Sequence, residues 1–311
     1  MLRHLIPAWM VAGALAAAPP LPPRAQMDQR IRAAISRTSG TVFLYARNLD
    51  TGEAYGIRED ERVRTASTIK LPIMVAVFAA VSQGRARWEE TLPLAEADKV
   101  SGSGVIREFS SGLRWPIRDL VNVMIVVSDN TATNLLLDRF TADAVNAEMD
   151  KLGLKQTRVL RKIVGDPANL KPQAAGWSAA GRIPENQPYG IGVSTPREMV
   201  TLLEKIENGQ VVSRAASRQM IEILKRQQYK NGIGRKLGEM PVASKSGALD
   251  RLRSDVGIVY APAGRLALAV TVDHLPEVDY SPDNPGAILI SELTQMLIGG
   301  LLQPAQRYSQ D

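Results

Sequence analysis

The hydrophobic and polar positions predict strands near both ends of the chain and helices between them. Residues 40–47 (GTVFLYAR) alternate and are rich in β-branched and aromatic side chains, which is typical of a strand. The turn signal Asp50-Thr51-Gly52 then allows residues 54–57 to return as a second strand. Further strands are expected in the last third of the chain, at residues 240–244, 255–260 and 266–273.

Apolar residues three and four positions apart predict helices through the middle of the chain and at its end. The expected helices are residues 29–35, 67–81, 117–127, 130–140, 143–152, 195–206, 213–228 and 287–302. Residues 87–112 are polar and contain glycines, so they are expected to be mostly loop. Residues 157–194 are rich in glycine, proline and asparagine without periodicity, and loops of this length in compact domains are usually functional.

The order of these elements indicates the fold class. Strands come first, helices follow, and then strands and a last helix return. This order favours an α/β (α+β) fold in which the first and last segments pair in one mostly antiparallel sheet, with helices on its faces. No linker divides the chain into independent domains.

Residues 1–25 read as a secretory signal peptide. Arg3 gives a positive start, and an apolar run from Leu5 to Ala18 follows before a proline-rich stretch. The run is too short to cross a bilayer comfortably, although an uncleaved anchor is the alternative. We expect cleavage between Ala18 and Gln26 and a secreted or periplasmic protein.

Composition excludes several classes of function. The 311-residue chain carries a formal charge of +6, but the excess is spread out and aromatic residues make up only 5%. No basic run with interleaved aromatics is present, so nucleic acid is not an expected partner. The chain has no cysteine, which excludes a thiol nucleophile, a thiolate metal site and disulfides.

The two histidines restrict the chemistry further. His4 lies in the leader, and His274 follows the strand-like run 266–272. A two-histidine metal site is therefore excluded, and a serine triad would have to use His274, which is better explained as a residue of a strand-end loop. Acyl transfer by this chain is expected to use a lysine or a carboxylate as its base, and no metal or organic cofactor is implied.

Three short motifs carry the candidate chemistry. In Ser67-Thr68-Ile69-Lys70, positions three apart share a helix face, so the amine can reach the hydroxyl. Ser128-Asp129-Asn130 lies between two expected helices, and Lys245-Ser246-Gly247 follows an expected strand. Each motif alone is common, since the first two also read as an ordinary helix start and a helix cap. Their conjunction in this order, each on a suitable element, is the informative observation.

With these motifs the chain resembles class A β-lactamases and penicillin-binding proteins along nearly its whole mature length. Further stretches that resemble the family are Arg64-Thr65-Ala66, Ser103-Gly104-Val105, Asp119-Leu120, Met124-Ile125, Asn130–Asn134 and Asp255–Tyr260. The resemblance implies a β-lactamase/transpeptidase-like fold with a five-stranded sheet in one lobe, residues 26–66 and 210–311. The other lobe, residues 67–209, would be helical, with the site between the two.

The resemblance also implies roles. Ser67 would be the acylated nucleophile, Lys70 would help to remove its proton, and Ser128 would pass a proton to the lactam nitrogen. The backbone N–H groups of Ser67 and Ala248 would form the oxyanion hole. Substrate would be bound by Asn130, by Lys245, Ser246, Gly247 and Ala248 of the strand, and by Arg253, or Arg251, as a helper.

One departure from the family pattern concerns deacylation. The family places a glutamate in the long loop, where it activates the deacylating water, and this chain has none in that setting. Asp166, in Gly165-Asp166-Pro167-Ala168-Asn169, is the nearest match and is also a plausible turn residue before proline. Its side chain is shorter by about one carbon–carbon bond, roughly 1.5 Å. Glu185 is a second candidate.

The leading functional hypothesis is therefore a serine β-lactamase that acts on a small lactam through an acyl-enzyme. The missing glutamate motivates an alternative, a D-alanyl-D-alanine peptidase or another penicillin-binding serine hydrolase with slow deacylation and a peptidoglycan-derived substrate. A third hypothesis, from another class, is a non-catalytic penicillin sensor. We expect a monomer that contacts a membrane only through an uncleaved leader, if at all.

Overall fold

The centre of the protein is an antiparallel sheet of five strands in the order β2-β1-β10-β9-β8. The computed structural model describes residues 23–165 and 177–302. The sheet therefore joins strands from both ends of the chain, and β10 lies between β1 and β9. The strands are β1 (Thr41–Asn48), β2 (Ala54–Ile57), β8 (Val242–Leu249), β9 (Leu252–Ala261) and β10 (Gly264–Asp273).

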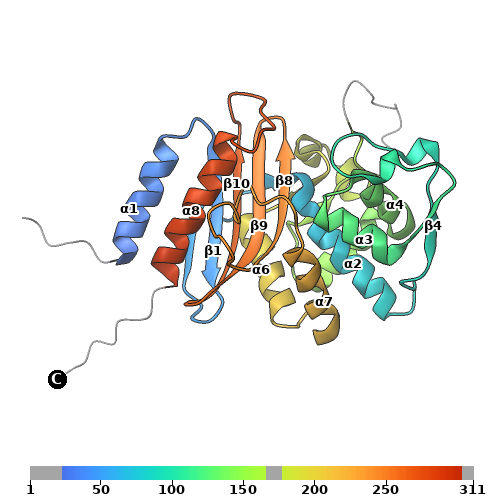
Figure 1. The fold of residues 1–311 in the computed structure, drawn as a ribbon, viewed down its shortest axis with the longest axis horizontal. Coiled ribbons are helices and arrows are strands. Elements are labelled where there is room, and N and C mark those ends of the chain that lie inside the picture. Colours follow the sequence, from blue (N-terminus) through green and yellow to red (C-terminus); the bar gives the residue numbers. More distant parts are fainter. Residues whose placement is uncertain (1–22, 166–176, 303–311) are drawn as a thin grey trace, which may run out of the picture.

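The two faces of this sheet are covered by different helices. On one face lie α1 (Pro23–Ser36) and α8 (Pro285–Leu301), side by side at the left of Figure 1. On the other face α6 (Pro196–Glu207) packs against β1 and β10, and α7 (Arg214–Lys225) packs against β8. Because both faces are covered, β9 and β10 are buried along most of their length and read as near-continuous apolar runs.

The remaining helices form the half of the molecule at the right of Figure 1. They are α2 (Lys70–Ser82), α3 (Ile117–Val126), α4 (Asn130–Phe140) and α5 (Ala142–Lys151). α2 runs through their centre, and its residues from Lys70 to Ala80 are all buried. A helix that is apolar on every side is a core helix, which explains why this segment shows no polar face.

Two small sheets lie outside the main one. β4 (Thr91–Pro93) pairs with β5 (Arg114–Pro116). β3 (Val63–Arg64), β7 (Gly192–Ser194) and β6 (Arg158–Val159) form the other, which connects both ends of the long loop to β3. β3 comes directly before the 3₁₀ turn η1 (Ala66–Ile69). The pairing of β3 with β7 therefore brings the end of the long loop beside Ser67.

The expected antiparallel sheet with flanking helices is confirmed, and the differences from the prediction are local. Ser67 lies on η1 rather than at the start of an α-helix, because α2 begins only at Lys70. Pro72 then falls in the first turn of α2, where a missing N–H costs nothing. The loop 157–194 also contains β6, β7 and the 3₁₀ turns η5 (Ala180–Arg182) and η6 (Pro184–Tyr189).

The lobe boundaries and the leader stay predictions. α6 lies within residues 67–209 of the sequence but packs on the sheet. The expected leader lies almost wholly outside the described residues, apart from its last residues, which belong to α1. Among the described residues, no helix has both the length and the apolar character needed to span a bilayer.

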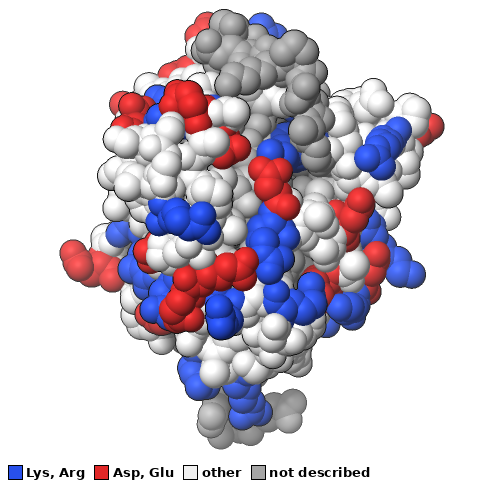
Figure 2. Space-filling model, turned by 90° about the vertical axis from the view of Figure 1, so that its right-hand side faces the viewer, with Lys and Arg blue, Asp and Glu red and all other residues white. Residues whose placement is uncertain are grey.

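Figure 2 shows acidic and basic side chains next to one another on the face of the helical half. Ion pairs such as Arg118–Glu89 (2.7 Å) and Arg139–Glu90 (2.6 Å) belong to this half. Charge of both signs is therefore interspersed on this face of the molecule.

Candidate active site

The three motifs meet at the side chain of Ser128, between α3 and α4. Lys70 Nζ, at the start of α2, donates to Ser128 O at 2.6 Å, to Asn130 Oδ1 at 2.8 Å and to Ser128 Oγ at 3.1 Å. Lys245 Nζ reaches the same Ser128 Oγ from β8 at 3.0 Å and also donates to Ser246 O at 2.7 Å. Two lysines from different elements, α2 and β8, therefore contact one hydroxyl. We call Lys70, Ser128, Asn130 and Lys245 the lysine cluster.

Both lysines are completely buried, which changes their acid–base behaviour. Each is 0% exposed. Burial holds the pKa of Lys70 well below its usual range, the charge of Lys245 lowers it further, and Asp129 opposes the shift. Burial also lowers the pKa of Lys245, to about 7, against the opposing charge of Asp255. An amine with such a lowered pKa can act as a base near neutral pH.

Two residues at the cluster hold a backbone conformation that is uncommon for side-chain-bearing residues. Ser128 has φ 54° and Ala66, just before Ser67, has φ 47°. This left-handed region costs about 1–2 kcal/mol for an ordinary residue. Such outliers persist where surrounding contacts enforce them, and they concentrate at functional sites.

Asp129 supplies much of that enforcement. Its Oδ2 accepts from Val105 N at 2.6 Å and Ile106 N at 2.8 Å, and its Oδ1 accepts from Ala132 N at 2.8 Å as the cap of α4. The side chain is 1% exposed. Asp129 therefore fixes the start of α4, and with it Ser128 and Asn130, against the loop that contains Val105.

Asn130 forms part of one wall of the site. Its Nδ2 donates to Ser101 O at 3.0 Å, and its backbone N donates to Ser103 O at 2.9 Å. Since Asn130 Oδ1 accepts from Lys70, this amide joins the loop of residues 101–103 to the lysine cluster.

Gly247 allows β8 to approach the turn that carries Ser67. A Cβ on Gly247 would lie 2.9 Å from Thr65 O and 3.0 Å from Ser67 N, closer than real Cβ atoms normally come. Ser67 is half-buried and Ala248 is exposed. The strand edge and the serine turn therefore lie side by side, as the sequence motifs require.

The expected contact between Lys70 and Ser67 is not a direct hydrogen bond. In the described part of the chain, the hydrogen bonds of Lys70 Nζ go to Ser128 and Asn130, and none joins it to the Ser67 hydroxyl. The two residues are nonetheless joined through the backbone of η1, where Lys70 N donates to Ser67 O.

Comparison with known proteins now identifies the family. The profile described as "Beta-lactamase enzyme family" matches residues 26–301. The chain belongs to this family. The β-lactamase from Sphaerobacter thermophilus has 31% sequence identity and a TM-score of 0.76, with 90% of this chain and 98% of that chain covered. The structure of PBP-A has 28% identity and a TM-score of 0.74, with 90% and 97% covered.

A curated relative agrees with this assignment. Beta-lactamase L2 from Stenotrophomonas maltophilia is 27% identical over 212 residues, which cover 67% of this chain and 62% of L2. The match thus spans less than two thirds of the length of L2. Family and fold are shared along the described chain, and the β-lactamase fold places the lysine cluster between its sheet and its helices.

Two asparagines fasten the long loop of this β-lactamase-family protein at its base. Asn146 Nδ2 donates to Val159 O at 2.9 Å and its Oδ1 accepts from Val159 N at 2.7 Å. Asn134 makes the same pair of bonds with Ile163: its Nδ2 donates to Ile163 O at 2.8 Å, and its Oδ1 accepts from Ile163 N at 2.9 Å. Ser178 N donates to Leu160 O at 2.9 Å and closes the base from the other side. We call Asn134, Asn146, Val159, Leu160, Ile163 and Ser178 the loop neck.

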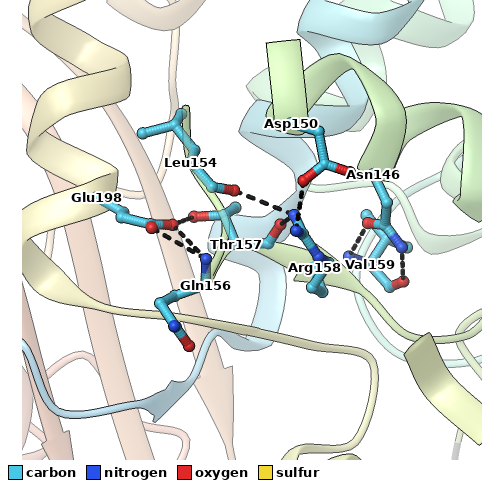
Figure 3. A network of polar contacts seen from close by, with 8 residues as sticks. All are labelled: Asn146, Asp150, Leu154, Gln156, Thr157, Arg158, Val159 and Glu198. Atoms are coloured by element: carbon cyan, nitrogen blue, oxygen red, sulfur yellow. Dashed lines mark hydrogen bonds and ion pairs between the residues drawn. The ribbon is translucent and has the colours of Figure 1, made fainter. Parts of the chain in front are cut away.

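Figure 3 shows how the start of this loop is held between α5 and α6. Glu198 of α6 accepts from Gln156 N at 2.9 and 3.0 Å and from Thr157 Oγ1 at 2.7 Å. Arg158 Nη2 donates to Asp150 of α5 at 2.6 Å. These contacts fix the entry to the loop on both sides.

Asp166 lies outside the described residues. Gly165, the last described residue before it, lies against Ser101, since a Cβ there would be 2.6 Å from Ser101 Oγ. The described part of the loop therefore ends beside the wall that Asn130 joins. Glu185 is exposed on η6, and no hydrogen bond or ion pair connects it to the lysine cluster in the described residues.

Both terminal nitrogens of Arg253 donate to backbone carbonyl oxygens. It is buried, its Nη1 donates to Leu249 O and Leu252 O, both at 2.6 Å, and its Nη2 donates to Asp279 O. Its guanidinium lies 4.9 Å from the ring centroid of Tyr280. The alternative helper, Arg251, is exposed. Arg253 therefore connects the β8–β9 hairpin to the loop between β10 and α8, which contains Asp279. Its role in substrate binding stays a prediction.

His274 lies exposed directly after β10, as a residue of a strand-end loop. Within residues 23–165 and 177–302, no cluster of three or more histidine, aspartate or glutamate side chains is arranged to hold a metal ion.

Sequence analysis missed the roles of Asp129 and Asp255. Asp129 was interpreted only as a helix cap, and its bonds to Val105 and Ile106 join segments far apart in the sequence. Asp255 is 2% exposed on β9, where burial raises its pKa to about 7 and the charge of Lys245 opposes the rise. Its one available signal was an acid within an otherwise apolar strand.

Proposed function

We propose that this protein is a class A-type serine β-lactamase that opens the lactam amide through an acyl-enzyme on Ser67. The observation that carries the proposal is the pair of buried lysines on Ser128 Oγ, at 3.1 and 3.0 Å. A serine hydrolase needs a base, and this site offers a lysine with a lowered pKa in place of histidine. Membership of the β-lactamase enzyme family supports the same reaction.

In acylation, Ser67 Oγ attacks the lactam carbonyl carbon and its proton passes to the neutral amine of Lys70. The carbon–nitrogen bond of the lactam then breaks, and Ser128 Oγ–H supplies the proton that the departing nitrogen needs. Lys70 returns its proton to Ser128 across the 3.1 Å contact. All groups are thereby restored except the ester on Ser67.

Binding follows from the same elements. The ammonium of Lys245 and the hydroxyl of Ser246 would hold the carboxylate of the substrate, and Asn130 would bind its side-chain amide. The backbone N–H groups of Ser67 and Ala248 would stabilise the oxyanion, as the close approach of β8 to η1 at Gly247 suggests.

Hydrolysis of the ester is the step in which this chain departs from its family. We propose that Asp166 activates the water, since Gly165 lies against Ser101 beside the wall of Asn130. The exposure of Glu185 disfavours that residue. A shorter acid can cost about a hundredfold in rate when a reacting group is displaced by about 1 Å. Deacylation should therefore be the slower half of the reaction.

The test is the time course with a chromogenic cephalosporin. We expect repeated turnover, with a burst equal to the enzyme concentration before the steady state. Ser67→Ala should abolish both, while Asp166→Asn should keep the burst and lose the steady state. A burst with no later turnover in the wild type would refute the β-lactamase proposal.

A second candidate function is a D-alanyl-D-alanine peptidase or a related penicillin-binding hydrolase. PBP-A, whose structure is similar, is also known as an acyl-enzyme complex of a point mutant with penicillin G, at 27% identity and a TM-score of 0.73. A long-lived penicillin adduct together with release of D-alanine from a D-alanyl-D-alanine peptide would favour this function. Release of no D-alanine would exclude it.

We also propose that residues 1–25 direct export. Sequencing the N-terminus of the protein recovered from the periplasm or medium should show a start between residues 19 and 26. A full-length chain retained inside the cell would contradict this proposal.

A further inference from the structure

A cavity of about 630 Å³ lies between α2, α3 and α7, and none of the residues that line it belongs to the lysine cluster or the loop neck. α7 packs against both α2 and α3, and Figure 1 shows the three helices next to one another. Ligand pockets in proteins typically measure about 300–1,000 Å³, so this one has the volume to bind a small molecule. We call it the α3–α7 cavity.

The inner surface of the α3–α7 cavity is aromatic and apolar. Phe78 of α2 and Trp88, in the turn before β4, pack edge to face with their ring centroids 4.7 Å apart. Val121 of α3 and Ile223 of α7 are buried and line the cavity beside them. Aromatic rings favour edge-to-face and offset packing, so a further ring placed against this pair would extend the same arrangement.

The rim of the cavity is charged, and two of its charged side chains already have a partner of opposite sign. Arg118 pairs with Glu89 at 2.7 Å, and Glu222 pairs with Lys225 at 2.9 Å. Such surface pairs contribute little to stability. Each pair nonetheless brings one positive and one negative group together, so neither leaves a net charge at the rim.

The other two charged residues of the rim, Arg218 and Arg226, have no acidic partner in residues 23–165 and 177–302. Arg226 donates to neutral oxygens, Asn122 Oδ1 at 2.6 Å and the backbone O of Glu222 at 3.1 Å. Arg218 is exposed and makes no hydrogen bond or ion pair with any described residue. A guanidinium presents a planar fork that matches the two oxygens of a carboxylate. The rim therefore favours an anion.

The walls of the cavity are fixed to each other where α3 and α7 end. Gln228 N donates to Val126 O at 3.0 Å, and Nε2 of the buried Gln227 donates to Ile125 O at 3.0 Å. These bonds hold the two helices together, and the cavity lies along the turns that precede them. A ligand that enters a cavity with fixed walls does not have to order them, which favours binding.

We propose that the α3–α7 cavity is a binding site for a small aromatic carboxylate. The ring would lie against Phe78 and Trp88, and the carboxylate would be bound by Arg218 in the positive field of Arg226. The site lies apart from the lysine cluster and its occupation involves no lactam chemistry. The proposal is therefore independent of the proposed function.

The test is isothermal titration calorimetry of the protein with 2-naphthoate, which carries one carboxylate on a two-ring aromatic system. We expect one saturable site whose affinity falls as salt is added, because the carboxylate pairs with an exposed cation. 2-Naphthylmethylamine carries the same rings with a positive charge and should bind much more weakly. Binding of the amine as tight as that of the carboxylate, or no saturable binding of 2-naphthoate at millimolar concentration, would overturn the proposal.

Charge reversal at the rim tests the role of Arg218. Arg218→Glu should weaken the binding of 2-naphthoate by about three- to tenfold, since it replaces an exposed attraction with a repulsion. Arg37→Glu is the matched control, because Arg37 is an exposed arginine just after α1, on the opposite face of the sheet from α7. This control should leave the affinity unchanged. Equal effects of the two variants would show that 2-naphthoate responds only to the overall charge of the protein.

A second pair of variants locates the ligand. Ala215 is exposed on α7 and lines the cavity, so the indole of Ala215→Trp should fill the space and abolish binding without changing the charge. Lys245→Met should leave the affinity unchanged. Loss of binding in Lys245→Met but not in Ala215→Trp would place the ligand at the lysine cluster and refute the proposal. A wild-type dimer that Ala215→Trp dissociates would show instead that a second copy of the chain fills the cavity.

Discussion

The lysine cluster and the loop neck both include buried polar side chains and both draw on α4, through Asn130 and Asn134 respectively, but they satisfy their polar groups with different chemistry. In the cluster, two fully buried amines converge on Ser128 Oγ. In the neck, the neutral amides of Asn134 and Asn146 each satisfy one backbone N–H and one C=O. The cluster therefore depends on charge and pH, whereas the neck depends on shape and hydrogen-bond count.

This difference indicates what each region is for. A buried charge costs stability unless it is paired, so a pair of adjacent buried lysines is hard to explain by folding alone. Paired amide brackets satisfy every group they touch and hold a loop in one place. We therefore expect the cluster to serve the proposed chemistry at a cost in stability, and the neck to hold residues 159–163 against α4 and α5.

The largest expected effect is that of Lys70→Ala. Removing the base should lower the rate of acylation by a penicillin by about a hundredfold to ten-thousandfold, since a positioned base contributes on the order of 10²–10⁴. Stopped-flow measurement of acyl-enzyme formation checks this. Residual acylation within tenfold of the wild type would show that another group takes the proton of Ser67.

The pH profile of the wild type sharpens the same point. Lys70 must be neutral to accept a proton, and its lowered pKa means that acylation should rise with pH through a midpoint far below that of an ordinary lysine. A rise that continues to pH 10 would show that Lys70 stays an ammonium ion in the site.

Asn134→Ala should have the next largest effect and should act on stability. It leaves the N–H and C=O of the half-buried Ile163 without their partner, and the loss should lie toward the lower end of the roughly 1–3 kcal/mol that a buried group would cost. Urea unfolding should show this loss equally at pH 6 and pH 8, because no titrating group is involved. A loss of stability that changes strongly with pH would show that a titrating group, and not the neutral amides alone, holds the neck.

The double variant Lys245→Met with Asp255→Asn should have a free energy of unfolding about 1 kcal/mol higher than the wild type. It should therefore unfold at a higher temperature, while losing activity. The lowered pKa of Lys245 destabilises the fold below about pH 7 and is relieved toward the unfolded pKa near 10.5. The raised pKa of Asp255 destabilises it above about pH 7 and is relieved toward 3.8. Thermal unfolding should therefore show the largest gain near pH 7. A gain that is the same from pH 4 to pH 10 would contradict these titrations.

The smallest effect is expected at the surface of the neck. Lys162 pairs with Asp138 of α4 at 2.6 Å, and the Asp138 side chain is 49% exposed. Exposed ion pairs contribute about 0–1 kcal/mol, so Asp138→Asn should change the unfolding midpoint little and less still in high salt. A loss as large as that of Asn134→Ala would mean that charge, not amide bracketing, holds the neck.

The elements that repeat a pattern could be predicted from the sequence, and the features that depend on distant contacts could not. The strand at residues 54–57 and the helix at residues 130–140 match β2 and α4, because burial on a regular face leaves a periodic signal. The motif residues Lys70, Ser128 and Lys245 were also placed on elements that meet.

The positive φ of Ser128 and the 3₁₀ turn at Ser67 left no such signal, because surrounding contacts impose them. Asn134 and Asn146 looked like ordinary polar positions of helices, since their partners lie 29 and 13 residues further along the chain. Asp255 is placed opposite Ser246 by the register of β9 with β8, which no local pattern encodes.

The most direct test of the lysine cluster as acyl-transfer machinery is mass spectrometry of the intact protein during reaction with a penicillin. The wild type should gain the full mass of one penicillin, peptide mapping should locate it on Ser67, and the adduct should disappear as the drug is consumed. A protein that never gains this mass, or carries it on another residue, would contradict the account.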